Sequence, residues 1–168
     1  MLRLNIGSGQ RKFGAGWINV DSQARWTPDV CIDGWAYLTQ QKDASVEMIC
    51  LHHVLEHYGC GEADALLAEC HRVLAPGGGL LVFVPDMAEL MLAWNYGRID
   101  TQIFMTNVYG AYMGDEADRH KWGFTFQTLK STLKKAEFPS VERFDWRKIP
   151  GADIAGPDFW ILGMEATK

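Results

Sequence analysis

The sequence predicts an α/β fold with a mostly parallel, doubly wound sheet. Two observations predict this class. Near the N-terminus a short apolar run leads into Gly7-Ser8-Gly9, and a second run ends at Asp21. In the middle of the chain, residues 46–84 give a strand, then a helical pattern, then the wholly apolar run 80–84, which is typical of a parallel strand covered on both faces.

The first three expected strands are residues 2–6, 17–20 and 30–32. Too few residues separate them to form full crossover helices, so the N-terminal helices are expected to be abbreviated. Glycine has no Cβ, so the turn after the first strand lets backbone N–H groups approach a ligand closely. Asp21, at the end of the second strand, can accept hydrogen bonds from a ribose. This layout predicts a nucleoside-binding site.

A helix is expected over residues 62–74, because its apolar side chains recur on one stripe and the glycines after Pro76 end it. Asp86 has capping-box spacing and opens a second helix that runs through Trp94. Thr125 is the expected N-cap of a third helix. These helices connect the central strands of the sheet.

Residues 96–122 are rich in aromatic side chains and less regular. Residues 141–146 and 159–165 are expected to complete the sheet. No repeat or second domain is evident, so residues 1–168 are interpreted as one domain, in which 87–122 form a variable segment over the substrate.

The composition excludes several classes. A formal charge of −5 argues against nucleic-acid binding, which needs a basic surface. No apolar run approaches the roughly twenty residues that span a bilayer, so no membrane association is expected. The four cysteines show no Cys-x-x-Cys spacing and nothing resembles a signal peptide, which favours a cytoplasmic location with reduced thiols.

Five motifs, in the same order along the chain, resemble those of the class I S-adenosylmethionine-dependent methyltransferases. The nearest likeness is to a subgroup of small, predicted methyltransferases that are type 11-like. They are Leu-Asn-Ile-Gly-Ser-Gly at 4–9, Gly-Trp-Ile-Asn-Val-Asp at 16–21, His-Val-Leu-Glu-His at 53–57, Glu-Cys-His-Arg-Val-Leu-Ala-Pro-Gly-Gly at 69–78, and Val-Pro-Asp at 84–86. The resemblance implies a Rossmann-like fold with an antiparallel last strand, and S-adenosyl-L-methionine as the cofactor.

The resemblance also implies where the cofactor is held. The glycine turn passes under its methionine part, Asp21 holds the ribose hydroxyls, and Asp33 accepts from the adenine amino group. Backbone after the fourth strand contacts the methionine end, and Asn5 stands where an acidic residue is common in the wider family. The residues so implied are Asn5, Gly7, Ser8, Gly9, Asp21, Asp33, Gly34, Trp35, Leu51, His52 and His53.

Methyl transfer from a sulfonium needs proximity, orientation and sometimes a base. The candidate catalytic residues are His52, His57, His120 and Asp86. Each has a structural alternative: the histidines can pack or cap local turns, and Asp86 can be a helix N-cap.

His53 and His57 have the i, i+4 spacing of metal ligands, with Glu56 beside them. A further ligand is lacking, so no metal is expected.

The expected function is methyl transfer to a small-molecule acceptor, whose identity the sequence does not reveal. The alternative is a non-catalytic subunit that binds S-adenosylmethionine or S-adenosylhomocysteine. A nicotinamide dehydrogenase is disfavoured, because Gly-Ser-Gly-Gln at 7–10 lacks the third glycine of that fingerprint. The abbreviated helices leave one sheet face thinly covered. We expect that face to be covered either by residues 87–122 or by a second subunit in a homodimer.

Overall fold

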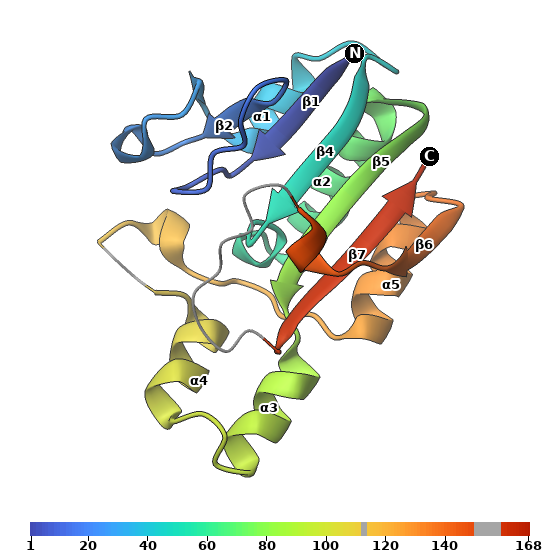
Figure 1. Ribbon diagram of the computed structural model, residues 1–168. Helices are drawn as coiled ribbons and strands as arrows, with labels where there is room; N and C mark the ends of the chain where they lie inside the picture. Colours follow the sequence, from blue (N-terminus) through green and yellow to red (C-terminus); the bar gives the residue numbers. More distant parts are fainter. Residues whose placement is uncertain (112–113, 150–158) are drawn as a thin grey trace.

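The computed structural model describes residues 1–111, 114–149 and 159–168 and contains a seven-stranded sheet of order β3-β2-β1-β4-β5-β7-β6 (Figure 1). Only β7 is antiparallel to its neighbours, β5 and β6, as the family resemblance implies. The strands are β1 (Leu2–Ile6), β2 (Ile18–Asp21), β3 (Val30–Cys31), β4 (Val46–His52), β5 (Leu74–Pro85), β6 (Ser140–Arg143) and β7 (Ile161–Thr167).

The strand order reverses between β1 and β4. From β1 the chain moves outward through β2 and β3, and it then returns to place β4 on the other side of β1. In open parallel sheets, ligands bind beyond the carboxyl ends of the strands at such a switch point. The topology therefore places the expected site beside the turns that follow β1 and β4.

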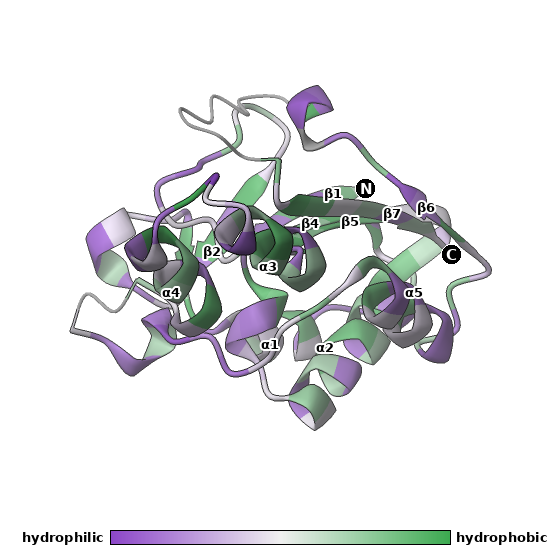
Figure 2. Cartoon of the chain, turned by 90° about the horizontal axis from the view of Figure 1, so that it is seen from below, coloured by the Kyte–Doolittle hydropathy of each residue, from purple (hydrophilic) through white to green (hydrophobic). Residues whose placement is uncertain are grey.

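Three helices cover one face of the sheet: α1 (Gly34–Thr39), α2 (Cys60–Val73) and α5 (Phe126–Lys135) (Figure 2). Their apolar sides pack on the inward residues of the strands in the main core, where Leu66 of α2 and Leu129 of α5 are fully buried. The predicted cap of α5 is confirmed, because the hydroxyl of Thr125 accepts from the Thr128 N–H at 3.3 Å.

The other face has no such helices over the described residues. The chain goes from β1 to β2 without a helix, and only the 3₁₀ turn η1 (Ala24–Trp26) lies between β2 and β3, which confirms the abbreviated N-terminus. A smaller cluster covers this face instead: Phe13 and Trp17 from the β1–β2 loop, and Phe144 and Ile149 after β6.

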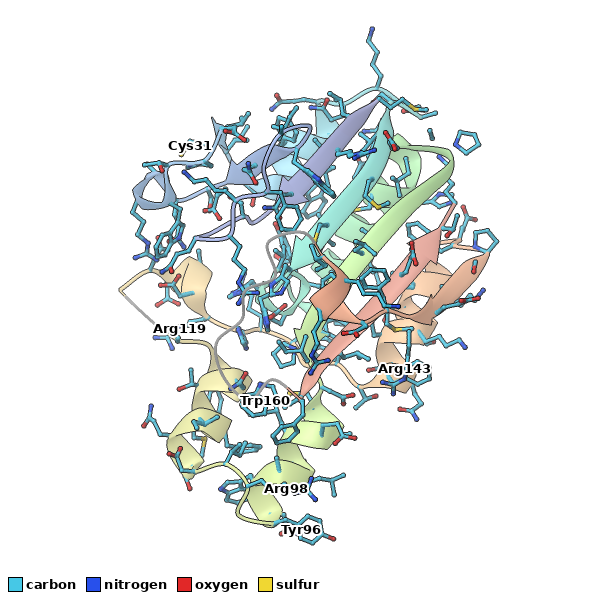
Figure 3. All side chains as sticks on the ribbon, in the orientation of Figure 1. Cys31, Tyr96, Arg98, Arg119, Arg143 and Trp160 are labelled. Carbon is cyan, nitrogen blue, oxygen red and sulfur yellow. The ribbon has the colours of Figure 1, made fainter. Side chains whose placement is uncertain are left out.

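Over its described residues, 87–111 and 114–122, the segment 87–122 does not cover that face, which corrects one of the two coverings expected from the sequence. The segment forms a hairpin of α3 (Met87–Asn95) and α4 (Thr101–Tyr109) that extends beyond the carboxyl ends of the parallel strands (Figure 1). Figure 3 places Tyr96 and Arg98 at its far tip. The second subunit stays a prediction.

The remaining elements are short 3₁₀ turns, namely η2 (Leu55–His57), η3 (Glu116–Asp118) and η4 (Trp146–Lys148). Two strands differ from expectation. β5 begins at Leu74, directly after α2, and so includes the Pro-Gly-Gly-Gly run. β6 ends at Arg143, and the expected strand end at Trp146 lies in η4 instead. None of the helices in the described ranges is both long and apolar enough to cross a bilayer.

Candidate functional site

A cavity of about 280 Å³ opens at the carboxyl ends of the first four strands. Its walls come from the turns after β1, β2, β3 and β4, and from the 117–121 segment that returns from the α3–α4 hairpin toward the sheet. The described lining residues are Gly7, Gly9, Asp21, Ser22, Gln23, Trp26, Asp33, Gly34, His53, Val54, His57, Tyr58, Ala117, Asp118 and Lys121.

The glycine turn after β1 needs its glycines for two different reasons. Both residues lie in the left-handed region, with φ of +63° at Gly7 and +48° at Gly9. A Cβ built on Gly7 would overlap Cγ2 of Val54, whereas a Cβ on Gly9 meets no described atom within 4 Å. Gly7 therefore lets the β1 and β4 turns pack together, and Gly9 keeps its backbone open to the cavity.

Ser8 lies buried between these glycines. Its backbone N–H donates to the Val20 carbonyl at 3.0 Å, which fixes the turn against β2. Its hydroxyl is buried and has no hydrogen-bond partner among the described residues. Ser8 is not among the described residues that line the cavity, so its side chain does not contribute to the wall in the way that the sequence predicts.

Asp21 ends β2, and backbone N–H groups hold its carboxylate. Oδ2 accepts from the Gly9 N–H at 2.8 Å, and Oδ1 accepts from the Gln23 N–H at 2.8 Å. The residue is 8% exposed and lines the cavity. Each carboxylate oxygen has a second lone pair, so the fixed carboxylate can still accept hydrogen bonds from a pair of ligand hydroxyls.

Asp33 and Gly34 form the next wall. Oδ1 of Asp33 caps α1 by accepting from the Ala36 N–H at 2.9 Å, and Oδ2 accepts from the Tyr58 hydroxyl at 3.3 Å. Burial and the Asp33 charge raise the pKa of Tyr58, so its hydroxyl keeps its proton and acts as the donor. A Cβ on Gly34 would overlap Cγ2 of Ile6, so only glycine allows α1 to start this close to β1.

Glu56 lies at the centre of a histidine cluster beside the cavity. The carboxylate is 1% exposed, and its Oε1 accepts from Nδ1 of His53 at 2.9 Å. The rings of His57 and His120 meet edge to face, with centroids 4.8 Å apart. Burial opposes the charged form of Glu56, but the hydrogen bond from His53 and the three nearby histidine rings together lower its pKa.

His52 points to the opposite face of the sheet. Its Nε2 lies 2.9 Å from Nη1 of Arg11, and its ring stacks on Phe83. Burial, with the charges of His53 and Arg11, lowers the pKa of His52 to about 2. A ring that stays neutral and accepts from an arginine is a structural group, and it is not among the described residues that line the cavity.

The structure brings part of the predicted set together. Of the implied cofactor residues, Gly7, Gly9, Asp21, Asp33, Gly34 and His53 line the cavity. Asn5 instead anchors the β1–β2 loop, donating to the Arg11 carbonyl at 2.7 Å and to Oδ1 of Asn19 at 2.9 Å. The side chains of Leu51 and Trp35 pack in or against the main core.

The structure places the four predicted catalytic residues in different surroundings. His57 lines the cavity, whereas His120 is not among the described lining residues and contacts the ring of His57. His52 lies on the opposite face, as described above. Asp86 is the N-cap of α3, with its Oδ1 accepting from the Ala88 N–H at 3.1 Å, which is its structural alternative.

Sequence reasoning missed Trp26, Tyr58 and Lys121 as lining residues. Tyr58 directly follows the His-Val-Leu-Glu-His motif, and this adjacency was a usable signal. The position of Trp26 at the cavity depends on η1, and that of Lys121 depends on the return of a distant segment. Local sequence patterns indicate neither feature.

The family model described as a methyltransferase domain matches residues 18–82. No curated protein sequence matches the chain significantly. Among solved structures, an S-adenosylmethionine-dependent methyltransferase from Archaeoglobus fulgidus matches with a TM-score of 0.66 and 16% identity, over 99% of this chain and 86% of that chain. Another from Thermotoga maritima matches with a TM-score of 0.62 and 17% identity, over 99% and 82%.

A third match is 1,6-didemethyltoxoflavin-N1-methyltransferase from Burkholderia thailandensis, solved with bound 1,6-didemethyltoxoflavin and S-adenosylhomocysteine. It has a TM-score of 0.59 and 19% identity, over 99% of this chain and 70% of that chain. At these identities the solved structures establish a shared fold, and the family model matches a segment, residues 18–82, that is less than half of the chain. The chain therefore has the fold of S-adenosylmethionine-dependent methyltransferases, and its N-terminal half is similar to a methyltransferase domain.

Proposed function

We propose that the described cavity binds S-adenosyl-L-methionine and that the chain transfers its methyl group to a small-molecule acceptor. One observation carries the proposal: the carboxylate of Asp21 is fixed by the Gly9 N–H, and Asp33 lines the same cavity. Carboxylates fixed at the ends of two neighbouring strands suit the ribose hydroxyls and the adenine amino group of a nucleoside.

The positions of the lining residues around the cavity suggest a role for each of them. Asp21 would hold the ribose, and Asp33, kept in place by Tyr58, would accept from the adenine. Trp26 and Tyr58 would supply the aromatic surface beside the adenine, in place of Trp35, because both line the cavity. The turn at Gly9 and the backbone near His53 would face the methionine end.

S-adenosylmethionine, when bound, supplies a methyl group on a sulfonium, which an acceptor atom displaces in line. The chain mainly has to place the acceptor and shield the reaction from water. Of the four predicted catalytic residues, His57 and His120 are retained, because His57 lines the cavity and the His120 ring contacts the His57 ring. Nδ1 of each ring donates a hydrogen bond to a backbone carbonyl oxygen. Each Nε2 therefore has a lone pair that can receive a proton or bind a cation.

The acceptor is proposed to be small, because the formal charge of −5 disfavours a nucleic acid. The four cysteines are free thiols, two of them exposed, which supports a reducing cytoplasm as the working location.

Calorimetric titration of the purified chain with S-adenosylmethionine and S-adenosylhomocysteine tests the proposal, with NAD as the control ligand. We expect dissociation constants of about micromolar order for the first two, equivalent to roughly −8 kcal/mol, and no binding of NAD. Absence of binding by both sulfur ligands would overturn the proposal. Binding without turnover across a panel of hydroxyl, amine and carboxylate acceptors would favour the non-catalytic subunit.

A further inference from the structure

Glu56, His57 and His120 form a compact group of potential metal ligands next to the cavity. Each offers one ligand atom, and these atoms all lie within 4.8 Å of one another. Glu56 and His57 come from the 3₁₀ turn η2 directly after β4. His120 comes from the loop before α5, so the fold supplies the further ligand that the His53–His57 spacing lacks.

The loop that carries His120 is held at this place by the backbone. The N–H groups of Lys121 and Trp122 donate to the carbonyl oxygen of Glu56 at 2.8 and 3.1 Å, and the His120 N–H donates to the Tyr109 carbonyl at 3.1 Å. The three side chains therefore converge through fixed main-chain contacts between two distant segments.

Each imidazole has a backbone partner of the kind that metal-ligating histidines usually have. Nδ1 of His57 lies 3.0 Å from the carbonyl oxygen of Arg119, and Nδ1 of His120 lies 2.8 Å from the carbonyl oxygen of Asn107. A carbonyl oxygen only accepts, so we assign the proton of each neutral ring to Nδ1, which leaves the Nε2 lone pair available. Such a backbone partner fixes the tautomer and orientation of a ligating ring.

The carboxylate of Glu56 has one bonded and one unsatisfied oxygen. Its Oε1 is bonded to His53, but its Oε2 is buried and has no hydrogen-bond partner among the described residues. Leaving a charged oxygen buried and unpaired costs free energy. A cation bound between this oxygen and the two rings would satisfy it.

We propose that Glu56, His57 and His120 bind a divalent first-row transition metal, for which Zn²⁺ is the reference ion. Two imidazole nitrogens and one carboxylate oxygen suit Zn²⁺ or its neighbours, whereas Mg²⁺ and Ca²⁺ prefer all-oxygen sites. Tetrahedral zinc with bonds of about 2.1 Å keeps its ligand atoms roughly 3.4 Å apart, so binding draws the three side chains slightly together. His53 becomes the outer partner that orients Glu56.

Three protein ligands leave a coordination position open, as in catalytic zinc sites. Because His57 lines the cavity, the open position suits an oxygen or nitrogen atom of the acceptor. This role rests on the proposed methyl transfer, but metal binding itself does not. The two are separable, because binding is measured without S-adenosylmethionine.

The test is calorimetric titration of the full chain, stripped with a chelator, with Zn²⁺, and in parallel with Co²⁺ followed by visible absorption. The variants are Glu56→Gln, His57→Gln and His120→Gln. Two controls remove ligands elsewhere: His71→Gln, whose ring packs edge-on to Phe138, and a double Cys31→Ser and Cys60→Ser variant that removes the exposed thiols.

We expect one Zn²⁺ per chain, Co²⁺ bands in the visible range, and affinities in both controls equal to that of the unmodified chain. Each of the three ligand variants should bind Zn²⁺ at least about 100-fold more weakly, a loss at or beyond the 10- to 100-fold range typical of outer-shell partners. Far-UV circular dichroism without metal verifies that each variant is folded. The histidine variants decide the outcome if Glu56→Gln fails to fold.

Two results would overturn the proposal. One is an affinity that is the same in the unmodified chain and in the histidine variants. The other is loss of the Co²⁺ bands in the double serine variant, which would assign the ion to surface thiols. If the unmodified chain binds zinc but does not bind S-adenosylhomocysteine, the result would count against the proposed function alone.

Discussion

The carboxylate of Asp21 accepts a hydrogen bond from the backbone N–H of Gly9 at 2.8 Å, and this bond ties the end of β2 to the turn after β1. With the glycine turn held by an acidic side chain, the two segments that are proposed to face the nucleoside form one rigid unit. The short β1–β2 connection makes this direct contact possible, since no helix separates the strands.

The Asp21→Asn substitution should weaken binding of S-adenosylhomocysteine. An amide can accept at only one of its two ends, so either the Gly9 N–H or the Gln23 N–H faces an NH₂ group. We expect affinity to fall about 10- to 100-fold, the equivalent of one charge-assisted hydrogen bond of roughly 1.5–3 kcal/mol. Calorimetry measures the change, with Asp64→Asn on α2 as the matched control. An unchanged affinity would remove Asp21 from the site.

Gly7→Ala and Gly9→Ala should separate folding from binding. Both place alanine at a positive φ, which costs about 1–2 kcal/mol. Only Gly7→Ala also overlaps Val54, adding about 1–3 kcal/mol of overpacking. Gly7→Ala should therefore lower the free energy of unfolding more, and combining it with Val54→Ala should recover part of the loss.

Gly9→Ala should keep most of the stability and instead lose cofactor affinity, because its new methyl group points into open space beside the cavity. Urea unfolding and titration with S-adenosylhomocysteine measure the two effects. Equal destabilisation by both substitutions would contradict the contact between Gly7 and Val54.

His52 should make the fold sensitive to mild acid. Its pKa falls from 6.5 to about 2 in the folded chain, so below pH 6.5 the unfolded chain binds a proton that the folded chain does not. The free energy of unfolding therefore decreases as the pH falls through 6.5, by up to about 1.4 kcal/mol per pH unit for this group.

The His52→Gln variant lacks this titration while its side-chain oxygen can still accept from Arg11. Urea unfolding of both proteins between about pH 7 and about pH 5 tests the prediction. The unmodified chain should lose more stability than the variant over this range. Parallel profiles would show that His52 is accessible to protons in the folded state.

The sheet was predictable because its central strands are buried on both faces and therefore read as apolar runs. The same logic failed for α4: the structure describes it as a helix with none of its residues fully buried, so no apolar stripe indicated it. Its start depends on Asp100, whose carboxylate accepts from the Ile103 N–H at 2.7 Å. A single cap is a weaker signal than a buried stripe.

The candidate site divides in the same way. The glycine turn and Asp21 are local features of one short stretch, and both line the cavity as the sequence indicates. Trp35 and His52 lie near that site in sequence, but their side chains point elsewhere, because neighbouring residues in a strand or helix face different directions. The approach of His120 to Glu56 depends on a loop that closes over a long sequence separation.

The described lining residues come from 7–58 and 117–121, and none belongs to α3 or α4. The part of the α3–α4 hairpin before Asn107 can thus vary without altering the wall proposed for the nucleoside, whereas the carbonyls of Asn107 and Tyr109 hold His120 beside the 117–121 wall. Exchange of residues 87–106 between members of this fold is then a route to new acceptor preferences at constant cofactor affinity. Because the wall proposed for the nucleoside and the outer part of the α3–α4 hairpin are separate surfaces, one can change during evolution while the other is kept.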